Sequence, residues 1–500
     1  MKNIAEENLD FKSLEQEIFK IMCRIACELM RTYLEMRDMG IMAIRDTKEY
    51  RCVDKRATTV KTIMGEVAFT RHYYKKASGG YVFLLDEAMG IDCGCGLVSE
   101  NLAEQIVVEC TDKSFRKAAG NINCFTGQSI SAMGVWGAFQ KYGELVGQQA
   151  ARLKELDDSG SSGHLGNIPS PVIFEEFDDV WLSMQREKRL KPGERARAPR
   201  KKIGKKPMHV GTAYTGWSRS KDGRYKTENK IAYASYVEAS VFTSAFGALL
   251  RNRFDMDGVE RQIMNGDGAG WIKTEAEESD AILQLDPYHR SEAAIRAVGG
   301  SKGDRRALFD AIGEKDVGKV LDTICGLLMA AKDEPAFKRL AKLYGYYYGN
   351  RDIFLTWQER GIELPAPPEG ITYRELGTQE SSNCSLITGR MKNRKGSWSV
   401  EGANHMAQIL CFRHTIGLDV IMGTLPEPSP TKSWADPLSA AKSPLHDGKG
   451  YGADWLYAQM PFEQAFRTQG RKVIRGMLRL KPLSSLPFLL GEGSNKTPRL

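Results

Sequence analysis

The spacing of hydrophobic residues changes several times along the chain, and each change predicts a different kind of element. Between residues 10 and 38, apolar residues recur every three or four positions, which predicts a helix. In residues 59–75, β-branched and aromatic residues alternate around Gly65, which predicts a β-hairpin. Helical spacing returns in residues 97–148. We therefore expect an N-terminal region of helices and one hairpin over residues 1–157.

The helical pattern of residues 97–148 is interrupted at Phe125-Thr126-Gly127. Two short helices are expected around this break, with Ser129 or Ser131 as the cap of the second one. Two helices joined in this way have the form of a helix-turn-helix, and an ordinary helical hairpin has the same form. Both interpretations stay open at this level.

A stretch rich in Gly and Ser at residues 158–166 marks a domain boundary, and the pattern then becomes that of strands. A helical face that begins at Phe242 separates the third strand from the fourth. The five predicted strands lie in residues 171–185, 208–217, 229–239, 261–272 and 281–286. Three strands, a helix and two further strands is the order of a ribonuclease H-like fold. The sequence therefore predicts an α/β domain with a mixed five-stranded sheet, its first part spanning residues 167–289.

Residues 290–370 have helical spacing again, with apolar stripes that include Val320 and Leu340. This stretch follows the last predicted strand and is far longer than the ~2–6 residues that usually connect two elements. We expect an inserted all-α domain here. The α/β domain would resume at residues 371–426, and a tail over residues 427–500 would follow.

Composition and length narrow the class of protein. Five hundred residues exceed the ~250–300 at which single cores stop growing, which favours several domains. No run approaches the ~18 apolar residues that span a bilayer, and the acidic N-terminus is unlike a signal peptide. Ten cysteines without an export signal suit a reducing compartment. Cys93 and Cys95, with Cys110 and Cys124, lack the paired spacing of common zinc sites. A cytoplasmic protein is expected.

The positive charge is concentrated in two segments. Residues 186–207 contain eleven Lys and Arg against two Glu, and residues 467–500 contain eight against one, whereas the whole chain has a net charge of +8. The rest of the chain is therefore acidic. Concentrated basic segments suit a polyanion, because each neutralised phosphate releases condensed counterions. A solvated loop and a solvated tail are the alternative.

Two aspartates stand where packing does not explain them. Asp178 lies in the middle of a predicted strand, and alternation places its neighbour Asp179 on the opposite face. Asp267 ends an apolar strand between Gly266 and Gly268, which let backbone and ligand approach closely. A turn-forming Asp-Gly pair is the alternative for Asp267. Clustered carboxylates hold the two divalent ions, ~3.5–4 Å apart, that phosphodiester chemistry uses.

Successive blocks of the chain resemble the ISLre2 family of insertion-sequence transposases. The resemblance is collinear from about residue 50 to residue 410. More distantly, the chain resembles the Mutator and IS256 transposases, which share a ribonuclease H-like domain of the DDE type. The blocks that carry the resemblance are TIMGEVAFTRHYYKK, YVFLLDEAMG, FEEFDDVWLSMQ, NGDGAGWIK, LDPYHR and LGTQESSNCSLITGRMKNRKGSWSVEGANHM.

The resemblance implies a role for each matching acidic residue. Asp178 would be the first catalytic carboxylate, Asp267 the second, and Glu380, in LGTQESSN, the third. Together they would hold two Mg²⁺ or Mn²⁺ ions. Glu401, in SWSVEGANHM, is the alternative for the third position. Asp179 stands where a glycine is expected after the first carboxylate, which leaves Asp179 as the alternative to Asp178.

The same resemblance draws attention to Asp286 and His289, in LDPYHR. The wider superfamily often carries Asp-x-x-His or Cys-x-x-His after the second aspartate. His289 would contact the scissile phosphate or the DNA, and a histidine bonded to local backbone is the alternative. Four Lys and Arg in residues 389–396 would position phosphates near Glu380.

These features predict a DNA transposase that binds the terminal inverted repeats of its element through the N-terminal region. It would cleave a phosphodiester at each end and join the freed 3′-hydroxyl to target DNA. Bringing two ends together requires at least a dimer, and the site of action would be the bacterial nucleoid. The alternatives are a non-catalytic DNA-binding protein derived from a transposase, and a ribonuclease H-like nuclease without strand transfer.

Overall fold

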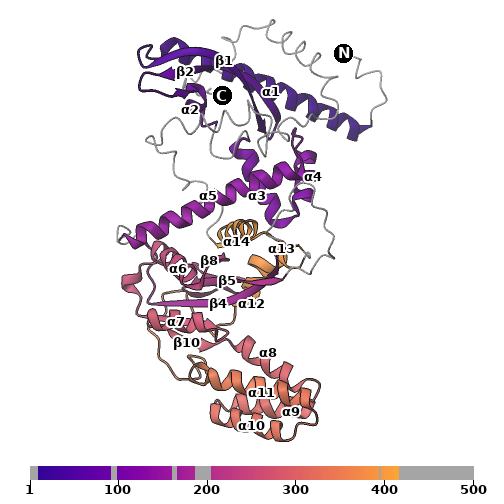
Figure 1. Cartoon of the computed structure of the whole chain (residues 1–500), viewed down its shortest axis with the longest axis vertical. Coiled ribbons are helices and arrows are strands. Elements are labelled where there is room, and N and C mark those ends of the chain that lie inside the picture. The colour runs from indigo at the N-terminus through magenta and orange to yellow at the C-terminus, as the bar shows by residue number, and fades with distance from the viewer. Residues whose placement is uncertain (1–9, 92–97, 160–165, 186–203, 394–395, 416–500) are drawn as a thin grey trace, which may run out of the picture. The chain divides into compact units, whose positions relative to one another are not determined.

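A computed structural model describes residues 10–91, 98–159, 166–185, 204–393 and 396–415 (Figure 1). The described residues fall into two compact units, one that extends to Tyr142 and one that begins at Gly143.

The N-terminal unit contains the predicted hairpin, which is longer than expected. Strands β1 (Tyr50–Thr62) and β2 (Gly65–Lys76) pair antiparallel around a turn at residues 63–64. Buried Val67 and Phe69 pack with Leu34 of the first helix in one apolar cluster. The other elements of this part of the chain are α1 (Phe11–Ile44), β3 (Tyr81–Val82), α2 (Leu84–Met89), α3 (Glu100–Asp112), α4 (Phe115–Phe125) and the start of α5 (Ala132–Asp158).

The predicted break in the helical region is confirmed at residues 126–131, between α4 and α5. The Ser131 hydroxyl accepts a hydrogen bond from the Gly134 amide at 3.1 Å, so Ser131 rather than Ser129 caps α5.

The second unit contains the predicted mixed five-stranded sheet, whose strand order is β10-β9-β4-β5-β8. The central strand β4 pairs antiparallel with β5 and parallel with β9, while β10 pairs parallel with β9 and β8 pairs antiparallel with β5. The strands are β4 (Val172–Ser183), β5 (Lys205–Tyr214), β8 (Ile231–Ser235), β9 (Arg261–Gly266) and β10 (Ile282–Leu285).

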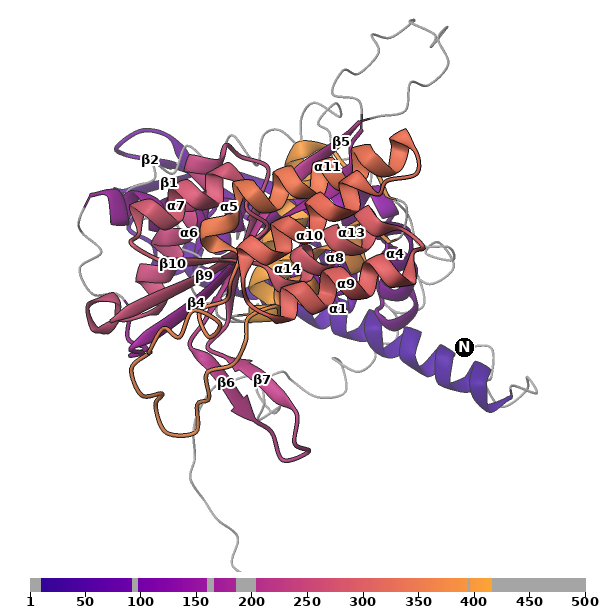
Figure 2. The same ribbon diagram turned by 90° about the horizontal axis from the view of Figure 1, so that it is seen from below.

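The strand predicted over residues 208–217 is interrupted near its end. Gly216 has φ +137°, and a Cβ there would lie 2.5 Å from Ile371 Cγ2, so glycine allows the chain to leave the sheet at this point. The short strands β6 (Gly216–Arg219) and β7 (Tyr225–Glu228) then form a hairpin that projects from the sheet (Figure 2).

The two faces of the sheet are covered differently. On one face, Phe177 of β4 packs edge-on against Phe246 of α6 (Ala239–Arg253) and Trp271 of α7 (Gly270–Glu278). On the other face, Phe174 and Tyr214 belong to an apolar cluster near the start of β4. Helix α12 (Gln379–Asn383) lies over the same face, followed by a π-helical turn (Cys384–Thr388) and α13 (Gly389–Met391), while α14 (Val400–Thr415) packs against β8.

Four helices follow β10, with a core of their own that includes Leu308, Ile324 and Leu343. They lie side by side in Figure 2: α8 (Pro287–Val298), α9 (Lys302–Gly313), α10 (Val317–Met329) and α11 (Glu334–Gly349). The helical prediction was wrong for the last part of residues 290–370. After a 3₁₀ turn at Arg351–Ile353 the chain is irregular up to residue 378, and the prolines of LPAPPEG prevent a helix there.

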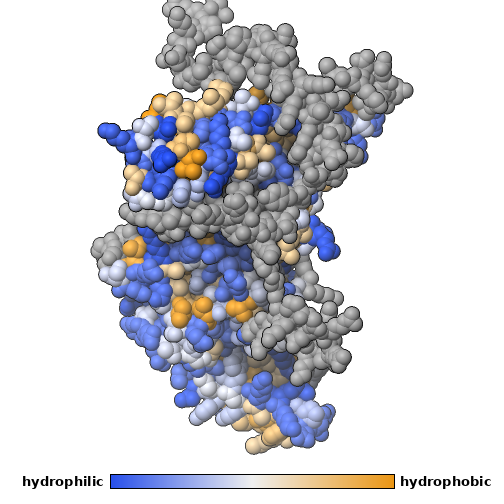
Figure 3. Space-filling view, turned by 45° about the horizontal axis from the view of Figure 1, so that its top comes forward, coloured by the Kyte–Doolittle hydropathy of each residue, from blue (hydrophilic) through white to orange (hydrophobic). Residues whose placement is uncertain are grey.

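No described helix is long and apolar enough to cross a membrane. On the side drawn in Figure 3, hydrophobic residues stand in small groups on a mostly hydrophilic surface.

Candidate active site

Three neighbouring parallel strands carry polar residues at matching positions, which lie in the middle of β4 and near the ends of β9 and β10. The register aligns Glu176 of β4 with Asn265 of β9, and Asn265 with Gln284 of β10. Two residues further along stand three aspartates: Asp178, still within β4, and Asp267 and Asp286, which directly follow β9 and β10. The pattern therefore consists of a buried polar row and, beyond it, a row of carboxylates.

The Asp178 side chain is held on both of its oxygens. The Asn383 amide of α12 donates to Oδ2 at 2.6 Å, and the Asp179 backbone amide donates to Oδ1 at 2.7 Å. Burial raises the pKa of Asp178 to about 6; the charge of His289 opposes this shift and the charge of Asp267 adds to it. The two aspartates are therefore close enough to repel one another.

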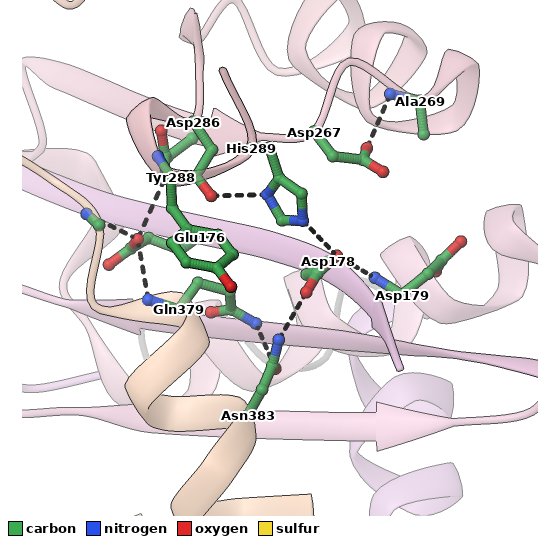
Figure 4. Close-up of polar contacts among 12 residues, drawn as sticks. Glu176, Asp178, Asp179, Asp267, Ala269, Asp286, Tyr288, His289, Gln379 and Asn383 are labelled. Carbon is green, nitrogen blue, oxygen red and sulfur yellow. Dashed lines mark hydrogen bonds and ion pairs between the residues drawn. The ribbon is translucent and has the colours of Figure 1, made fainter. Parts of the chain in front are cut away.

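His289 links the two outer carboxylates of the row. Its Nδ1 lies 2.7 Å from Asp286 Oδ2, and its Nε2 lies 3.7 Å from Asp178 Oδ1, so the ring stands between them (Figure 4). Burial alone would lower the pKa of His289, but the hydrogen bond with Asp286 and the neighbouring carboxylate charges outweigh it and raise the pKa to about 9. At neutral pH the imidazole is a cation beside Asp178.

Asp267 follows β9 directly, in the turn that leads into α7. Its Oδ1 accepts a hydrogen bond from the Ala269 amide at 2.9 Å, and its backbone carbonyl accepts one from the Tyr346 hydroxyl of α11 at 2.8 Å. Burial raises the pKa of Asp267 as well, against the Ala269 hydrogen bond and the charge of His289. The helices α8 and α11 thus contact this end of the sheet.

The turn after Asp267 depends on Gly268. Its φ is +86°, and a Cβ on it would lie 2.4 Å from Asn350 Oδ1. We expect Gly268→Ala to lower the free energy of unfolding by ~1–3 kcal/mol, because alanine is strained at this φ and collides with Asn350. Urea unfolding would measure the change. Gly270→Ala is the matched control: a Cβ there meets nothing within 4 Å, and its unfolding free energy should stay the same or rise.

Asp179 lies on the opposite face of β4 from Asp178. Its Oδ1 is 2.7 Å from Nδ1 of His209, its register partner on β5. The ring of His209 in turn packs against Trp271. Asp179 is therefore engaged with the face that α6 and α7 cover.

The two candidates for the third carboxylate lie in different surroundings. Glu380 is exposed in the first turn of α12, and its charge is the main reason why the pKa of Tyr288 is raised. Tyr288 precedes His289 and points toward the start of α12 (Figure 4). Glu401 is exposed at the start of α14, where its charge acts on His405. Glu380 belongs to the helix whose Asn383 hydrogen-bonds Asp178, and Tyr288, on which its charge acts, is next to His289.

Comparison with known proteins identifies the family. A model of the family described as "Uncharacterised protein family (UPF0236)" matches residues 4–423. The chain belongs to this family. A relative from Streptococcus gallolyticus, described as "UPF0236 protein in vanSb 3′region", is 21% identical over 421 residues, which are 81% of this chain and 84% of that protein.

Two solved structures are also similar to this UPF0236 chain: the Mos1 strand transfer complex and a pre-cleavage Mos1 transpososome. Each is 12% identical and covers 51% of this chain and 78% of the other chain. Their TM-scores are 0.12 and 0.13, values too low to carry an argument about fold or function.

The donor chemistry of the aspartate row fits a hard divalent cation. Asp178 and Asp267 are carboxylates on one edge, and each has a raised pKa that a bound cation would relieve. Within the described residues, no group of three His, Cys, Asp or Glu is close enough together to hold a metal ion. Mg²⁺ commonly takes only one or two carboxylates and completes its shell with water and substrate phosphates. In donor type, Asp178 and Asp267 are therefore of the kind that Mg²⁺ takes, although the described residues form no group of three.

Several predicted contributors to the site lie elsewhere or outside the described residues. Of the four cations in residues 389–396, Arg390 is buried with its guanidinium 5.3 Å from the centre of the Trp398 ring, and Lys392 is exposed. Arg394 and Lys395 lie outside the described residues, as do most of the first basic segment (186–203) and the C-terminal tail.

The sequence interpretation missed the buried polar residues beneath the aspartates. Glu176 has no exposed surface, and Gln379 and Asn383 are buried as well. Period two in FEEFDDV places Glu176 on the face of Asp178, and a spacing of four places Gln379 and Asn383 on one side of a helix. These spacings are the signals that could have found them.

Proposed function

We propose that this UPF0236 protein is a DDE-type DNA transposase of the ISLre2 kind. The observation that carries the proposal is the row of carboxylates, with Asp178 within the central strand β4 and Asp267 directly after the neighbouring parallel strand β9. The strand order, with three antiparallel strands followed by two parallel ones, is that of a ribonuclease H-like sheet. The resemblance of the sequence blocks to ISLre2 transposases supports the same conclusion.

Each side chain of the site would have its own role in the proposed reaction. Asp178, Asp267 and Glu380 would hold two Mg²⁺ or Mn²⁺ ions, which when bound stabilise the attacking and leaving oxygens of a phosphodiester. Asn383 orients Asp178, and the cation of His289 faces the same edge and offers a contact for a phosphate. Water would cleave the strand at each element end, and the freed 3′-hydroxyl would then attack target DNA. One phosphodiester bond breaks as another forms in this second step, so no external energy source is needed.

Binding of the DNA would involve other parts of the chain. The helices of residues 97–148 would recognise the terminal inverted repeats, and the helices of residues 290–370 would form an inserted domain that engages the cleaved end. The basic segments 186–207 and 427–500 would contact phosphates, which makes binding strongly dependent on salt. Two element ends brought together imply at least a dimer on DNA, in the bacterial cytoplasm.

Incubation of the protein and Mg²⁺ with DNA that carries the sequences flanking its gene would test this function. We expect nicks at the element ends, followed by sequenced junctions in which an end is joined to target DNA. Cleavage without junctions would instead indicate a ribonuclease H-like nuclease. Imperfect inverted repeats and a short target duplication around the gene are an independent expectation.

A non-catalytic DNA-binding protein is the second candidate. It is favoured by the lack of a preassembled group of three metal-binding side chains among the described residues. Such a protein would bind end-containing DNA and leave it uncut in both Mg²⁺ and Mn²⁺, a result that excludes the transposase.

A further inference from the structure

The carboxylate of Glu176 is the most heavily hydrogen-bonded group near the aspartate row. It has no exposed surface. Its Oε1 accepts from the Tyr214 hydroxyl, the Thr378 amide and the Thr378 hydroxyl at 2.6, 3.1 and 2.5 Å. Its Oε2 accepts from the Gly377 amide, the Gln379 amide and the Asn265 side chain at 3.0, 3.2 and 3.1 Å. A buried charge is tolerated when donors surround it in this way.

These donors leave no free position for a cation. A carboxylate offers about four lone-pair positions, and six donors already converge on this one. Glu176 lies one polar row below the aspartates, on the same face of β4 as Asp178. Glu176 is therefore close to the candidate metal site, but its oxygens have no free position with which to bind a metal ion.

The three backbone donors belong to the start of α12, which has no other cap. The helix has five residues, and Thr378, at its N-cap position, makes no capping hydrogen bond with its own side chain. So short a helix is unstable in isolation, and its first amides need acceptors. Glu176 supplies those acceptors from about 200 positions earlier in the chain.

The chain that leads to α12 is irregular but packed against the domain, with Leu376 buried in the apolar cluster of Phe174 and Trp217. Residues 354–378 contain no helix and no strand longer than one bridge, at Thr372, which pairs with Trp217 of β6. Beyond the start of α12, contacts to the sheet are made by side chains: Thr212 donates to Gln379 Oε1 at 2.9 Å, and Asn383 donates to Asp178. α12 is thus held by apolar packing of the residues before and after it and by a set of polar contacts, of which Glu176 makes the most.

We propose that Glu176 is a positioning residue: its buried carboxylate caps α12 from the central strand and thereby holds the helix that carries Glu380 and sets its Asn383 against Asp178. The assignment of a catalytic role to α12 rests on the proposed function, whereas the capping itself does not. Glu176 acts through the helix and touches neither substrate nor metal.

Hydrogen exchange of Glu176→Gln tests the capping directly. Glutamine has the same shape, but its NH₂ group must face at least one of the three backbone N–H donors, whichever way the amide is turned. We expect the amides among residues 377–379 that face this NH₂ group to exchange at least ~10-fold faster than in the wild type, since they lose their acceptor. The amides of β4 and β5 should keep their protection. Unchanged exchange at residues 377–379 in the folded variant would overturn the proposal.

Glu175→Gln is the matched control for this substitution. Glu175 is the preceding residue, is also buried, and lies on the other face of β4. Burial raises the pKa of Glu175 to about 8, so its carboxyl is mostly protonated at pH 7 and glutamine imitates it closely. Exchange at residues 377–379 should be as slow in this variant as in the wild type.

Thr378→Val provides a milder variant if Glu176→Gln does not fold. It removes only the hydroxyl that donates to Glu176 Oε1 and leaves the carboxylate in place. Exchange at residues 377–379 should again rise, by a smaller factor, while the sheet stays protected. If exchange rises equally throughout the sheet in both variants, Glu176 supports the whole fold and the specific role is refuted.

DNA cleavage separates this proposal from the proposed function. With active wild-type protein, Glu176→Gln should cleave roughly 10²-fold more slowly, because a small misplacement of catalytic groups has effects of that size. Full cleavage activity despite fast exchange at residues 377–379 would refute the link between the cap and catalysis. If the wild type cleaves no DNA, the exchange experiment still decides whether Glu176 caps α12, and only the proposed function fails.

Discussion

Replacement of Asp178 or Asp267 by asparagine is expected to reduce the rate of DNA strand cleavage by on the order of 10³-fold. Metal ions contribute several kcal/mol to phosphodiester chemistry, and each 1.36 kcal/mol corresponds to a factor of about ten in rate. Asparagine keeps the size of the side chain and removes the charge that, in the proposed function, would hold the cation. Single-turnover cleavage of end-containing DNA in Mg²⁺ would measure the loss.

Asp179→Asn is the control for these two substitutions. It lies next to Asp178 but faces the other side of the sheet, where it pairs with His209. Its cleavage rate should remain within a few-fold of the wild type. DNA binding, measured by gel shift, should persist in all three variants. Equal cleavage by wild type, Asp178→Asn and Asp267→Asn would show that the aspartate row has no catalytic role.

The second large effect concerns His289 and the pH dependence of stability. The folded protein holds the pKa of His289 at about 9, above the ordinary value of 6.5. A pKa that is higher in the folded state means that the proton binds more tightly after folding. The resulting stabilisation is complete below pH 6.5 and is lost as the pH rises through 9. The shift corresponds to about 3 kcal/mol.

Comparison with His289→Gln isolates this contribution. In EDTA, the free energy of unfolding of the wild type relative to the variant should fall by about 3 kcal/mol between pH 6 and pH 10. Glu175, whose pKa is about 8, also titrates in this range, but it is present in both proteins and its effect cancels. Urea unfolding at several pH values would measure the difference. A difference that does not change with pH would show that His289 is not held as a cation by its neighbours.

Much of the architecture could be read from local patterns. The β1–β2 hairpin, the α4–α5 break and the order of the five sheet strands follow from alternation, helical spacing and glycine, because these depend on residues near one another in the chain. The helical prediction failed after Gly349, because the predicted helical stretch extended beyond the last apolar stripe into a segment that contains prolines. The projecting hairpin β6–β7 was missed because its strands have only four residues each.

The candidate site also contains residues that the sequence could identify and residues that it could not. The aspartates could be singled out because a carboxylate in an apolar strand is conspicuous against its neighbours. Asn383 and Gln379 could not, because polar residues in a short helix look like ordinary surface residues until the opposing strand is known. The basic segments that suggested a nucleic-acid partner lie mostly outside the described residues, so their role remains a prediction from charge.

The sequence by itself determined most of the segments that become strands and helices. It also determined which acidic residues stand out among them, since both depend on short-range periodicity and chemical contrast. Only the tertiary structure decided that Asp178, Asp267 and Asp286 form one row and that Glu176 caps a helix about 200 residues later. Register between strands and the burial of a charge are set by long-range packing. Through this packing, a side chain contacts residues that are distant along the chain.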